Sequence, residues 1–179
     1  MKSNTPDSWG SVARLLHWTV ASLIVLQFPL GWIGGDLENS PFKVNWMITH
    51  KSLGVTILLL MLARLLWRMA QATPHPPAGT PPWQERLAAG VHWSLYAVVL
   101  ATTLAGWVIA DTSRIPWKWW WYLPLPDFLP VVTDVHEAAE DIHEALGWVL
   151  FTVLAVHVAA ALWHHFVRRD EVLRRMWTG

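Results

Sequence analysis

The chain has 179 residues, of which 54% are hydrophobic and only 15% are charged. Its length favours a single domain, and its composition leaves too little polar surface to coat a soluble particle of this size. A formal net charge of zero gives no electrostatic reason to expect nucleic acid as a partner. The absence of cysteine excludes disulfides, thiolate iron–sulfur ligation and covalent haem attachment. We therefore expect one membrane domain over residues 1–179.

Four apolar stretches are long enough to cross ~30 Å of hydrocarbon, which takes roughly 20 helical residues. We place them at residues 14–35, 48–69, 88–110 and 143–166. The sequence thus predicts an all-α fold, an integral membrane four-helix bundle.

The connections between these helices differ in character. Residues 71–84, QATPHPPAGTPPWQ, are rich in proline, which favours a stiff solvated loop. Residues 111–141 carry prolines and tryptophans and then acidic residues, so we expect an interfacial segment whose acidic end leads into the fourth helix.

The basic residues indicate the orientation, because Lys and Arg collect on the cytoplasmic side of short membrane loops. If both termini lie inside, nine of the 13 Lys and Arg residues are cytoplasmic, and nine of the 13 Asp and Glu residues are on the opposite side. We therefore predict that both termini of this multi-pass membrane protein are cytoplasmic.

Nine histidines are many for a membrane protein, where ionisable side chains are expensive and mark function. His143 and His157 lie 14 residues apart, which corresponds to ~21 Å of rise on nearly the same helix face. This spacing fits two haems stacked along the fourth helix, each with one axial imidazole from that helix and one from a facing helix.

Depth in the membrane indicates the partners of these two histidines. His50 starts the second helix at the outer level of His143, so these two can hold an outer haem. His17 lies near the inner end of the first helix, at the level of His157, so these two can hold an inner haem. His92 lies at a depth similar to that of His17 and remains an alternative inner ligand. His92 and Lys51 are also candidates to bind a haem propionate or quinone.

A weak internal repeat relates the two halves of the chain. His17-Trp18 and Gly31-Trp32 recur with the same spacing as His92-Trp93 and Gly106-Trp107, and His50 and Gly54 correspond to His143 and Gly147. A duplicated hairpin and chance similarity both explain these matches. A glycine one turn past each histidine removes a side chain that would press on a porphyrin face.

Other polar residues have competing interpretations. Arg64 follows His50 by 14 residues and is expected to face inward, where it can pair with a haem propionate or a quinone oxygen, or else extend to the interface as Arg68 does. We interpret His75 and His136 as packing residues. His164 and His165 are expected to cap the inner end of the fourth helix.

With these residues in view, the sequence resembles the bacterial cytochrome b561 family over nearly its whole length. The resemblance rests on His17-Trp18, on HKSLGVTILLLMLARLLWR with the proline-rich loop after it, on His92, and on HEALGWVLFTVLAVHVAAALWHHF. It implies two haem b groups with His17, His50, His143 and His157 as ligands. It also implies a location in the bacterial inner (cytoplasmic) membrane and a likeness to the cytochrome b subunits of hydrogenases and formate dehydrogenases.

The expected function is transmembrane electron transfer linked to quinone. The resemblance suggests a quinone-linked oxidoreductase that oxidises superoxide at the outer face and reduces ubiquinone. Lys51, with Lys43, Arg114 and Lys118, would attract the anion despite the acidic outer loops. The alternatives are a membrane anchor that relays electrons to or from a separate periplasmic redox protein, and a haem-free helical protein, which would be colourless.

Overall fold

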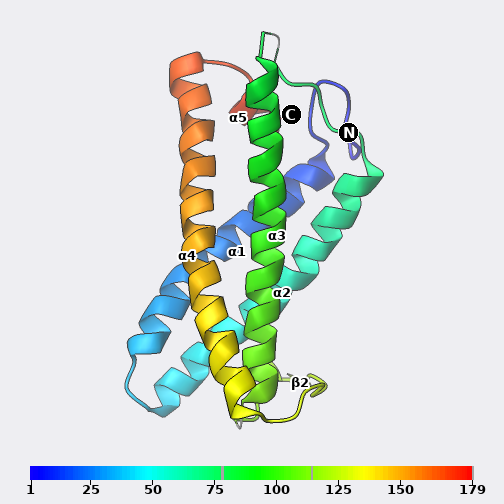
Figure 1. The fold of residues 1–179 in the computed structure, drawn as a ribbon. Helices are drawn as coiled ribbons and strands as arrows, with labels where there is room; N and C mark the ends of the chain where they lie inside the picture. Colours follow the sequence, from blue (N-terminus) through cyan, green and yellow to red (C-terminus); the bar gives the residue numbers. More distant parts are fainter. Residues whose placement is uncertain (78, 114, 179) are drawn as a thin grey trace.

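The computed structural model describes residues 1–77, 79–113 and 115–178 (Figure 1). Four long helices dominate it: α1 (Ser11–Asp36), α2 (Pro41–Ala70), α3 (Pro82–Thr112) and α4 (Thr133–Trp163). A π-helical turn over His164–Arg168 continues α4, and a short helix α5 (Val172–Trp177) follows. Two strands of two residues each, β1 (Lys118–Trp119) and β2 (Leu123–Pro124), pair antiparallel in the connection between α3 and α4.

All four long helices have the length and composition of membrane spans. The shortest, α1, has 26 residues, or ~39 Å at 1.5 Å per residue. Large apolar side chains are exposed along all of them, among them Leu66, Leu87 and Trp148. In water such a surface would be unfavourable, whereas in lipid it is the expected one.

Each of the four predicted helices is present, but three begin well before their predicted starts, among them α3, which begins at Pro82 instead of residue 88. α2 begins at Pro41 instead of residue 48, because Ser40 caps it by accepting a hydrogen bond from the Lys43 backbone N–H and Pro41 occupies its first turn. α4 begins at Thr133 instead of residue 143. The prediction that residues 111–141 form a connection is therefore wrong for residues 133–141. Hydropathy locates only the apolar part of a helix, and the backbone remains helical beyond it.

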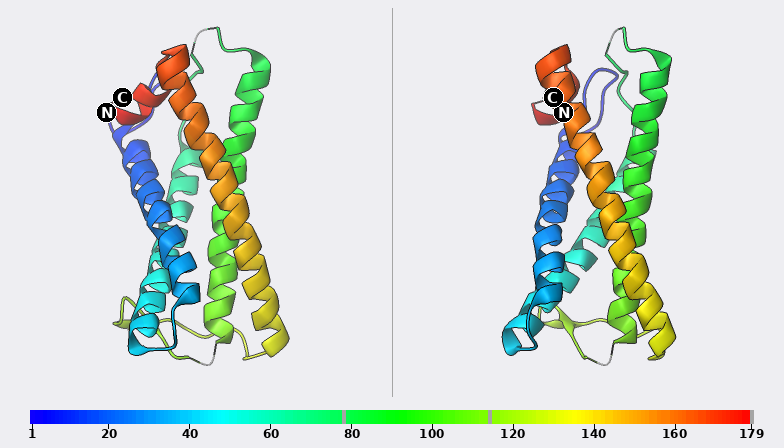
Figure 2. Two further views of the ribbon diagram at one scale, coloured as in Figure 1. Left: turned by 90° about the vertical axis from the view of Figure 1, so that its left-hand side faces the viewer. Right: turned by 60° about the vertical axis from the view of Figure 1, so that its left-hand side comes forward.

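The helices form two antiparallel hairpins, α1 with α2 and α3 with α4, and the hairpins meet most closely where α2 packs on α3 (Figures 1 and 2). Both termini lie at the same end of the bundle. The buried centre consists of seven side chains from all four helices: Val20, Ile24, Ile57, Met61, Tyr96, Val99 and Leu150.

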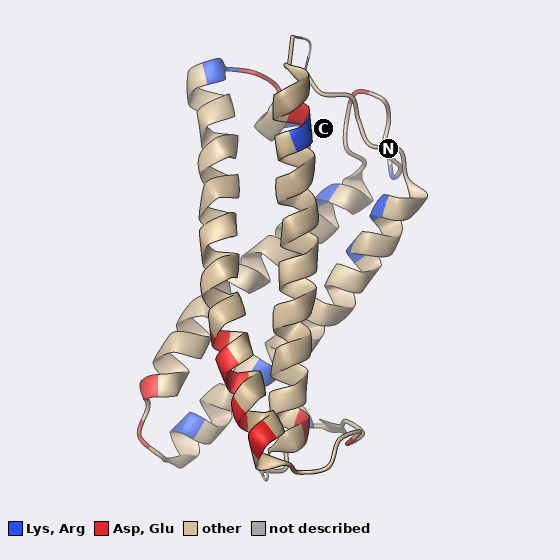
Figure 3. Cartoon of the chain, in the orientation of Figure 1, with Lys and Arg blue, Asp and Glu red and all other residues tan. Residues whose placement is uncertain are grey.

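Charge separates the two ends of the bundle (Figure 3). Lys and Arg are frequent at the end that carries both termini, which we call the basic end. Asp and Glu gather at the opposite end, the acidic end, and above all on the first turns of α4. This is the separation that the sequence predicts for a bundle with both termini on one side.

The tryptophan-rich part of the α3–α4 connection is anchored to α2. Trp119 and Trp120 donate their indole N–H groups to the Ser52 carbonyl and the Thr56 hydroxyl, at 3.1 and 3.3 Å, and the Trp120 backbone N–H donates to the Ser52 hydroxyl at 2.9 Å. Trp120 and Trp121 have φ of 50° and 67° in the turn of the small hairpin, which costs roughly 1–2 kcal/mol per residue. The contacts with α2 offset this cost and fix the segment against the bundle.

The buried carboxylate of Asp111 is a second anchor for the same connection. It accepts hydrogen bonds from the backbone N–H groups of Phe128 and Leu129, the shortest at 2.7 Å. Asp111 lies near the end of α3 and is 8% exposed. Nearby, the Thr112 hydroxyl contacts His136 Nδ1 at 2.9 Å and so joins α3 to α4, in agreement with our interpretation of His136 as a packing residue.

The basic end is closed by contacts among the two termini and the α2–α3 loop. The Trp18 indole donates to the Met176 carbonyl at 2.8 Å, and Arg175 donates to the His75 carbonyl at 2.8 Å. The His75 backbone N–H in turn donates to the Pro6 carbonyl at 2.7 Å. α5 is thereby held beside α1, next to the position of His17.

Asp111→Ala is expected to loosen the α3–α4 connection. Loss of the hydrogen bonds from two backbone N–H groups to this charged acceptor costs about 1–3 kcal/mol, so the connection should open at least fivefold more often. Chymotrypsin should then cleave between residues 115 and 132 faster than in the unchanged protein. Asp127→Ala, which removes an exposed carboxylate from the same connection, is the control, and equal cleavage rates in the two variants would contradict the role of Asp111.

Candidate functional site

Two histidines from different hairpins face each other toward the acidic end. The imidazole rings of His50 on α2 and His143 on α4 have centroids 6.1 Å apart and planes at 83°. Each histidine lies about ten residues from the start of its helix, so the two helices bring them to the same depth. This is one of the pairs that the sequence predicts.

Glycines on the neighbouring helices allow these histidines to fit. A Cβ at Gly31 of α1 would lie 3.2 Å from His50 Cε1, and a Cβ at Gly106 of α3 would lie 3.0 Å from His143 Cε1. The two positions correspond in the internal repeat, and each glycine lets its helix approach the imidazole of the helix next to it. The repeat therefore has a structural counterpart at this level of the bundle.

Gly54 and Gly147, one turn past His50 and His143, differ in the space beside them. A Cβ at Gly54 would meet the Gln27 amide at 3.3 Å, whereas one at Gly147 would meet no atom of the described chain within 4 Å. Gly147 is therefore compatible with a bulky group beside His143, and Gly54 makes room for Gln27.

A backbone carbonyl orients His143. Its Nδ1 lies 2.9 Å from the Thr102 carbonyl oxygen, which can only accept a hydrogen bond. Nδ1 must therefore carry the proton, and Nε2 is left with a free electron pair. Metal-binding histidines commonly have this arrangement, in which an outer hydrogen bond fixes both the ring orientation and the tautomer.

Three histidines meet toward the basic end. His17 on α1 and His157 on α4 have ring centroids 6.3 Å apart, and His92 on α3 lies 5.5 Å from His157. The structure thus brings together the predicted pair and also its alternative.

Two arginines of α2 surround this group. The Arg64 Nη2 lies 2.9 Å from His17 Nδ1, and the Arg64 guanidinium lies 5.2 Å from the centre of the Tyr96 ring. Arg68 lies over the rings of Trp93 and Tyr96. Among the described residues no carboxylate lies within 4.0 Å of Arg64. An arginine placed this deep, without a carboxylate partner, can bind an anionic group.

The spacing of the two predicted pairs fits a haem iron. Two imidazoles bound to one metal from opposite sides have centroids ~6 Å apart, because each metal–nitrogen bond is ~2.0 Å and each nitrogen lies ~1.1 Å from its ring centre. His50–His143 and His17–His157 match this distance within a few tenths of an ångström. The His92–His157 distance is shorter.

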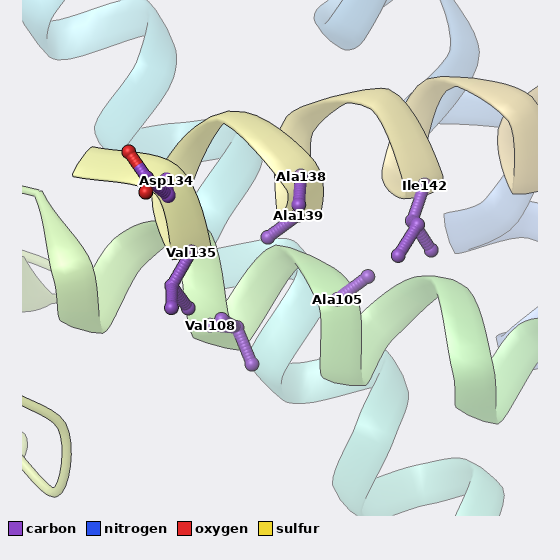
Figure 4. Close-up of a pocket in the computed structure, with 7 residues that line it drawn as sticks. All are labelled: Ala105, Val108, Asp134, Val135, Ala138, Ala139 and Ile142. Carbon is purple, nitrogen blue, oxygen red and sulfur yellow. The ribbon is translucent and has the colours of Figure 1, made fainter. Parts of the chain in front are cut away.

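Two shallow, open grooves lie elsewhere, between α3 and α4. One of about 390 Å³ is near the acidic end and is lined by seven residues, with Asp134 at one end (Figure 4): Ala105, Val108, Asp134, Val135, Ala138, Ala139 and Ile142. The other, of about 360 Å³, lies between Arg86 and Val156. None of the histidines described above lines either groove.

Comparison with known proteins gives the family. The family model described as prokaryotic cytochrome b561 matches residues 8–179. The chain is 26% identical to cytochrome b561 homolog 2 of Escherichia coli (strain K12) over 97% of this chain and 93% of that protein. It is 26% identical to cytochrome b561 homolog 1 of the same organism, over 90% of this chain and 92% of that protein. It is also 28% identical to the probable superoxide oxidase CybB of Yersinia pestis, over 90% of each chain.

A membrane bundle with facing histidines is the architecture of a cytochrome b, and the family match agrees with it. This chain belongs to the prokaryotic cytochrome b561 family. It is therefore an integral membrane helical bundle that binds haem b and takes part in electron transfer, as the sequence resemblance indicates.

The remaining predicted residues have different surroundings. Lys51 lies beside His50 and over the Trp117 ring, 5.8 Å from its centre. Lys43 donates its ammonium to the carbonyls of Gly35 and Leu37 and so caps α1. Arg114 lies outside the described residues.

Near the basic end, His164 contacts Asp170 across the turn that leads to α5. His164 is the C-cap residue of α4, the end of the helix at which we expected it.

Sequence reasoning missed Gln27, Tyr96, Thr102 and Asp111. Thr102 acts through its backbone carbonyl, which no residue type reveals. Gln27 is detectable as an amide within an apolar span, and Asp111 as a carboxylate at the end of one.

Gly106→Val is expected to lower the amount of haem b bound per chain. The added side chain would overlap the His143 imidazole, and overpacking of this kind costs about 1–3 kcal/mol. The reduced-minus-oxidised absorbance of the purified protein, related to protein concentration, measures the effect. Gly90→Ala on the same helix, where a Cβ would meet no described atom within 4 Å, is the control, and a full haem content in Gly106→Val would contradict the expected overlap.

Proposed function

We propose that the whole chain forms one di-haem cytochrome b domain that passes electrons across the membrane between its outer face and quinone. The spacing of the two histidine pairs, 6.1 Å for His50–His143 and 6.3 Å for His17–His157, carries this proposal. The pairs lie on opposite sides of the buried apolar centre that includes Ile57, so two cofactors fit at two depths.

The charges of the two ends support an orientation. The basic end, with both termini, faces the cytoplasm, and the acidic end faces the periplasm of a bacterial inner membrane. The His50–His143 pair is then the outer site, and the His17–His157 pair is the inner site.

Ligation by two histidines determines the kind of chemistry. A bis-histidine haem iron has no open position for substrate and supplies one-electron transfer when bound. The protein contributes the two imidazoles at each site, Arg64 beside the inner pair and the fixed distance between the sites. We therefore expect substrates to exchange electrons with the haem without binding to its iron.

Arg64 is proposed to bind a haem propionate or a quinone oxygen. A guanidinium only donates hydrogen bonds, so His17 accepts at Nδ1 in the observed contact and its Nε2 carries the proton. For Nε2 of His17 to bind iron, the proton must be on Nδ1 and Arg64 must turn away. After Arg64 has turned away from His17, a propionate carboxylate or a quinone oxygen would accept its hydrogen bonds.

Replacing single histidines by alanine is expected to separate the two sites. His50→Ala and His143→Ala should each lose the same haem, and His17→Ala and His157→Ala should each lose the other, because an iron held from one side only binds weakly. His92→Ala, the control, should keep both. Haem content and reduced-minus-oxidised spectra measure this. One haem or none in the unchanged protein would refute the proposal, and loss of a haem in His92→Ala but not in His17→Ala would reassign the inner ligand.

The proposed reaction is oxidation of superoxide outside and reduction of ubiquinone in the membrane. The similarity to a protein named probable superoxide oxidase supports it. Lys51 is the cation beside the outer pair, and among the described residues no carboxylate lies within 4.0 Å of its ammonium. It is therefore available to attract an anion, in a region that is otherwise acidic.

Lys51→Gln combined with Lys118→Gln is expected to slow the reduction of the haems by superoxide by several-fold. Removal of two positive charges lowers the local concentration of the anion, and the effect should shrink at high salt. Stopped-flow absorbance with a superoxide source measures the rate. Lys2→Gln, at the opposite end of the bundle, is the control. A rate unchanged by the double substitution would rule out electrostatic attraction by these lysines.

A second function is favoured by the acidic surface. Asp134, Glu137, Asp141 and Glu144 are exposed along the first turns of α4, the helix that carries His143. Such a stripe suits a basic redox protein that would exchange electrons with the outer site. Haem reduction that requires such a partner, with no response to superoxide, would favour this relay over the oxidase.

A further inference from the structure

The side chain of Gln27 lies between α1 and α2 beside the outer histidine. Its amide Nε2 donates to the backbone carbonyl of His50 at 3.0 Å. Because a carbonyl can only accept, the nitrogen end of the amide must face it, and Oε1 is the other end. Within the described chain, Gln27 Oε1 is buried and has no hydrogen-bond partner.

The imidazole of His50 has a complementary unpaired atom. Its Nδ1 is also buried and without a partner among the described residues. If Nε2 of His50 binds iron, Nδ1 carries the proton and needs an acceptor, whereas Gln27 Oε1 needs a donor. A buried donor or acceptor left unpaired costs about 1–3 kcal/mol, so joining the two removes two penalties.

The internal repeat compares the two outer histidines directly. The step of 75 residues that relates Gly31 to Gly106 also relates Gln27 to Thr102. Gln27 and Thr102 each lie four residues, about one turn, before the glycine that contacts a histidine. At Thr102 the backbone carbonyl accepts from His143 Nδ1. The described structure has no equivalent bond from His50 Nδ1, and the side chain at the equivalent position, Gln27, carries an unpaired oxygen.

We propose that Gln27 is a positioning residue for His50: its Oε1 accepts the Nδ1–H of His50, directly or through one buried water. This inference rests on the proposed function, because it concerns His50 as a haem ligand. The outer haem thus has one ligand oriented by a backbone carbonyl and the other by a side chain. An internal water with two or more polar partners is a common element of buried sites.

The hydrogen bond has an electronic consequence. An acceptor at Nδ1 makes the imidazole a stronger donor to the metal, which stabilises ferric iron and lowers the reduction potential. A side chain that only filled space would affect stability or haem content, but it would not shift the potential in a direction set by its oxygen atom.

The test is a redox titration of the purified holoprotein, followed by haem absorbance, on Gln27→Met and Gln27→Glu. Both variants lose the amide donor to the His50 carbonyl, but only Gln27→Glu keeps an acceptor oxygen. We expect the outer component, identified as the one absent from His143→Ala, to shift to a higher potential in Gln27→Met. It should remain at or below the unchanged value in Gln27→Glu, and the inner component should not move.

Thr102→Val is the matched control. The Thr102 hydroxyl donates to the Val98 carbonyl, and His143 contacts only the Thr102 backbone carbonyl. The variant keeps this carbonyl, so the reduction potential of neither haem should shift. An unchanged outer potential in Gln27→Met, or the same shift in the Met and Glu variants, would overturn the role of Gln27. Both results presuppose two bound haems, whereas a protein with one haem or none would refute the proposed function itself.

Discussion

The structure depends on placing polar imidazoles inside an apolar bundle. In a membrane a buried nitrogen cannot turn to water, so each ring needs a partner from a neighbouring helix or from a bound group. This requirement explains why the histidines face one another across the two hairpins and not outward into lipid. It also explains the glycines at the contacts, because only the absence of a side chain at Gly31 and Gly106 lets α1 and α3 come close enough to His50 and His143.

The two levels of the bundle meet this requirement in different ways. The level near the acidic end follows the internal repeat, with one histidine and one close glycine from each hairpin. Near the basic end, His17 and His92 keep the repeat, but α2 carries Arg64 where α4 carries His157, 14 residues after His50 and His143 respectively. The third imidazole and the cation at this level suit the quinone reduction that we propose, whereas the pair near the acidic end suits simple electron transfer.

The surroundings of each level are also fixed differently. At the acidic end, Asp111 and the Trp119–Trp120 contacts hold a long connection against α2 and α3, and they define a rigid surface near Lys51. At the basic end, α5 is tied to Trp18, next to His17. Each histidine level thus has near it a segment that is distant in sequence and is held to the bundle by hydrogen bonds.

The sequence by itself determined the four spans, the charge asymmetry and the histidines that face inward. These follow from local rules, namely apolar length, the sidedness of Lys and Arg, and the helical period that puts His143 and His157 on one face. The early starts of α2, α3 and α4 were missed because the apolar stretch begins later than the helical hydrogen bonding does.

Only the tertiary structure decided which atoms meet. The distance from His157 to His17 and to His92, the choice of the Thr102 carbonyl for His143 and the contact of Gln27 with His50 depend on how two hairpins pack. A sequence pattern gives the depth of a residue in the membrane and the face of its own helix on which it lies. It does not give the rotation and separation of a neighbouring helix, and differences of about 1 Å in these quantities distinguish a ligand from a neighbour.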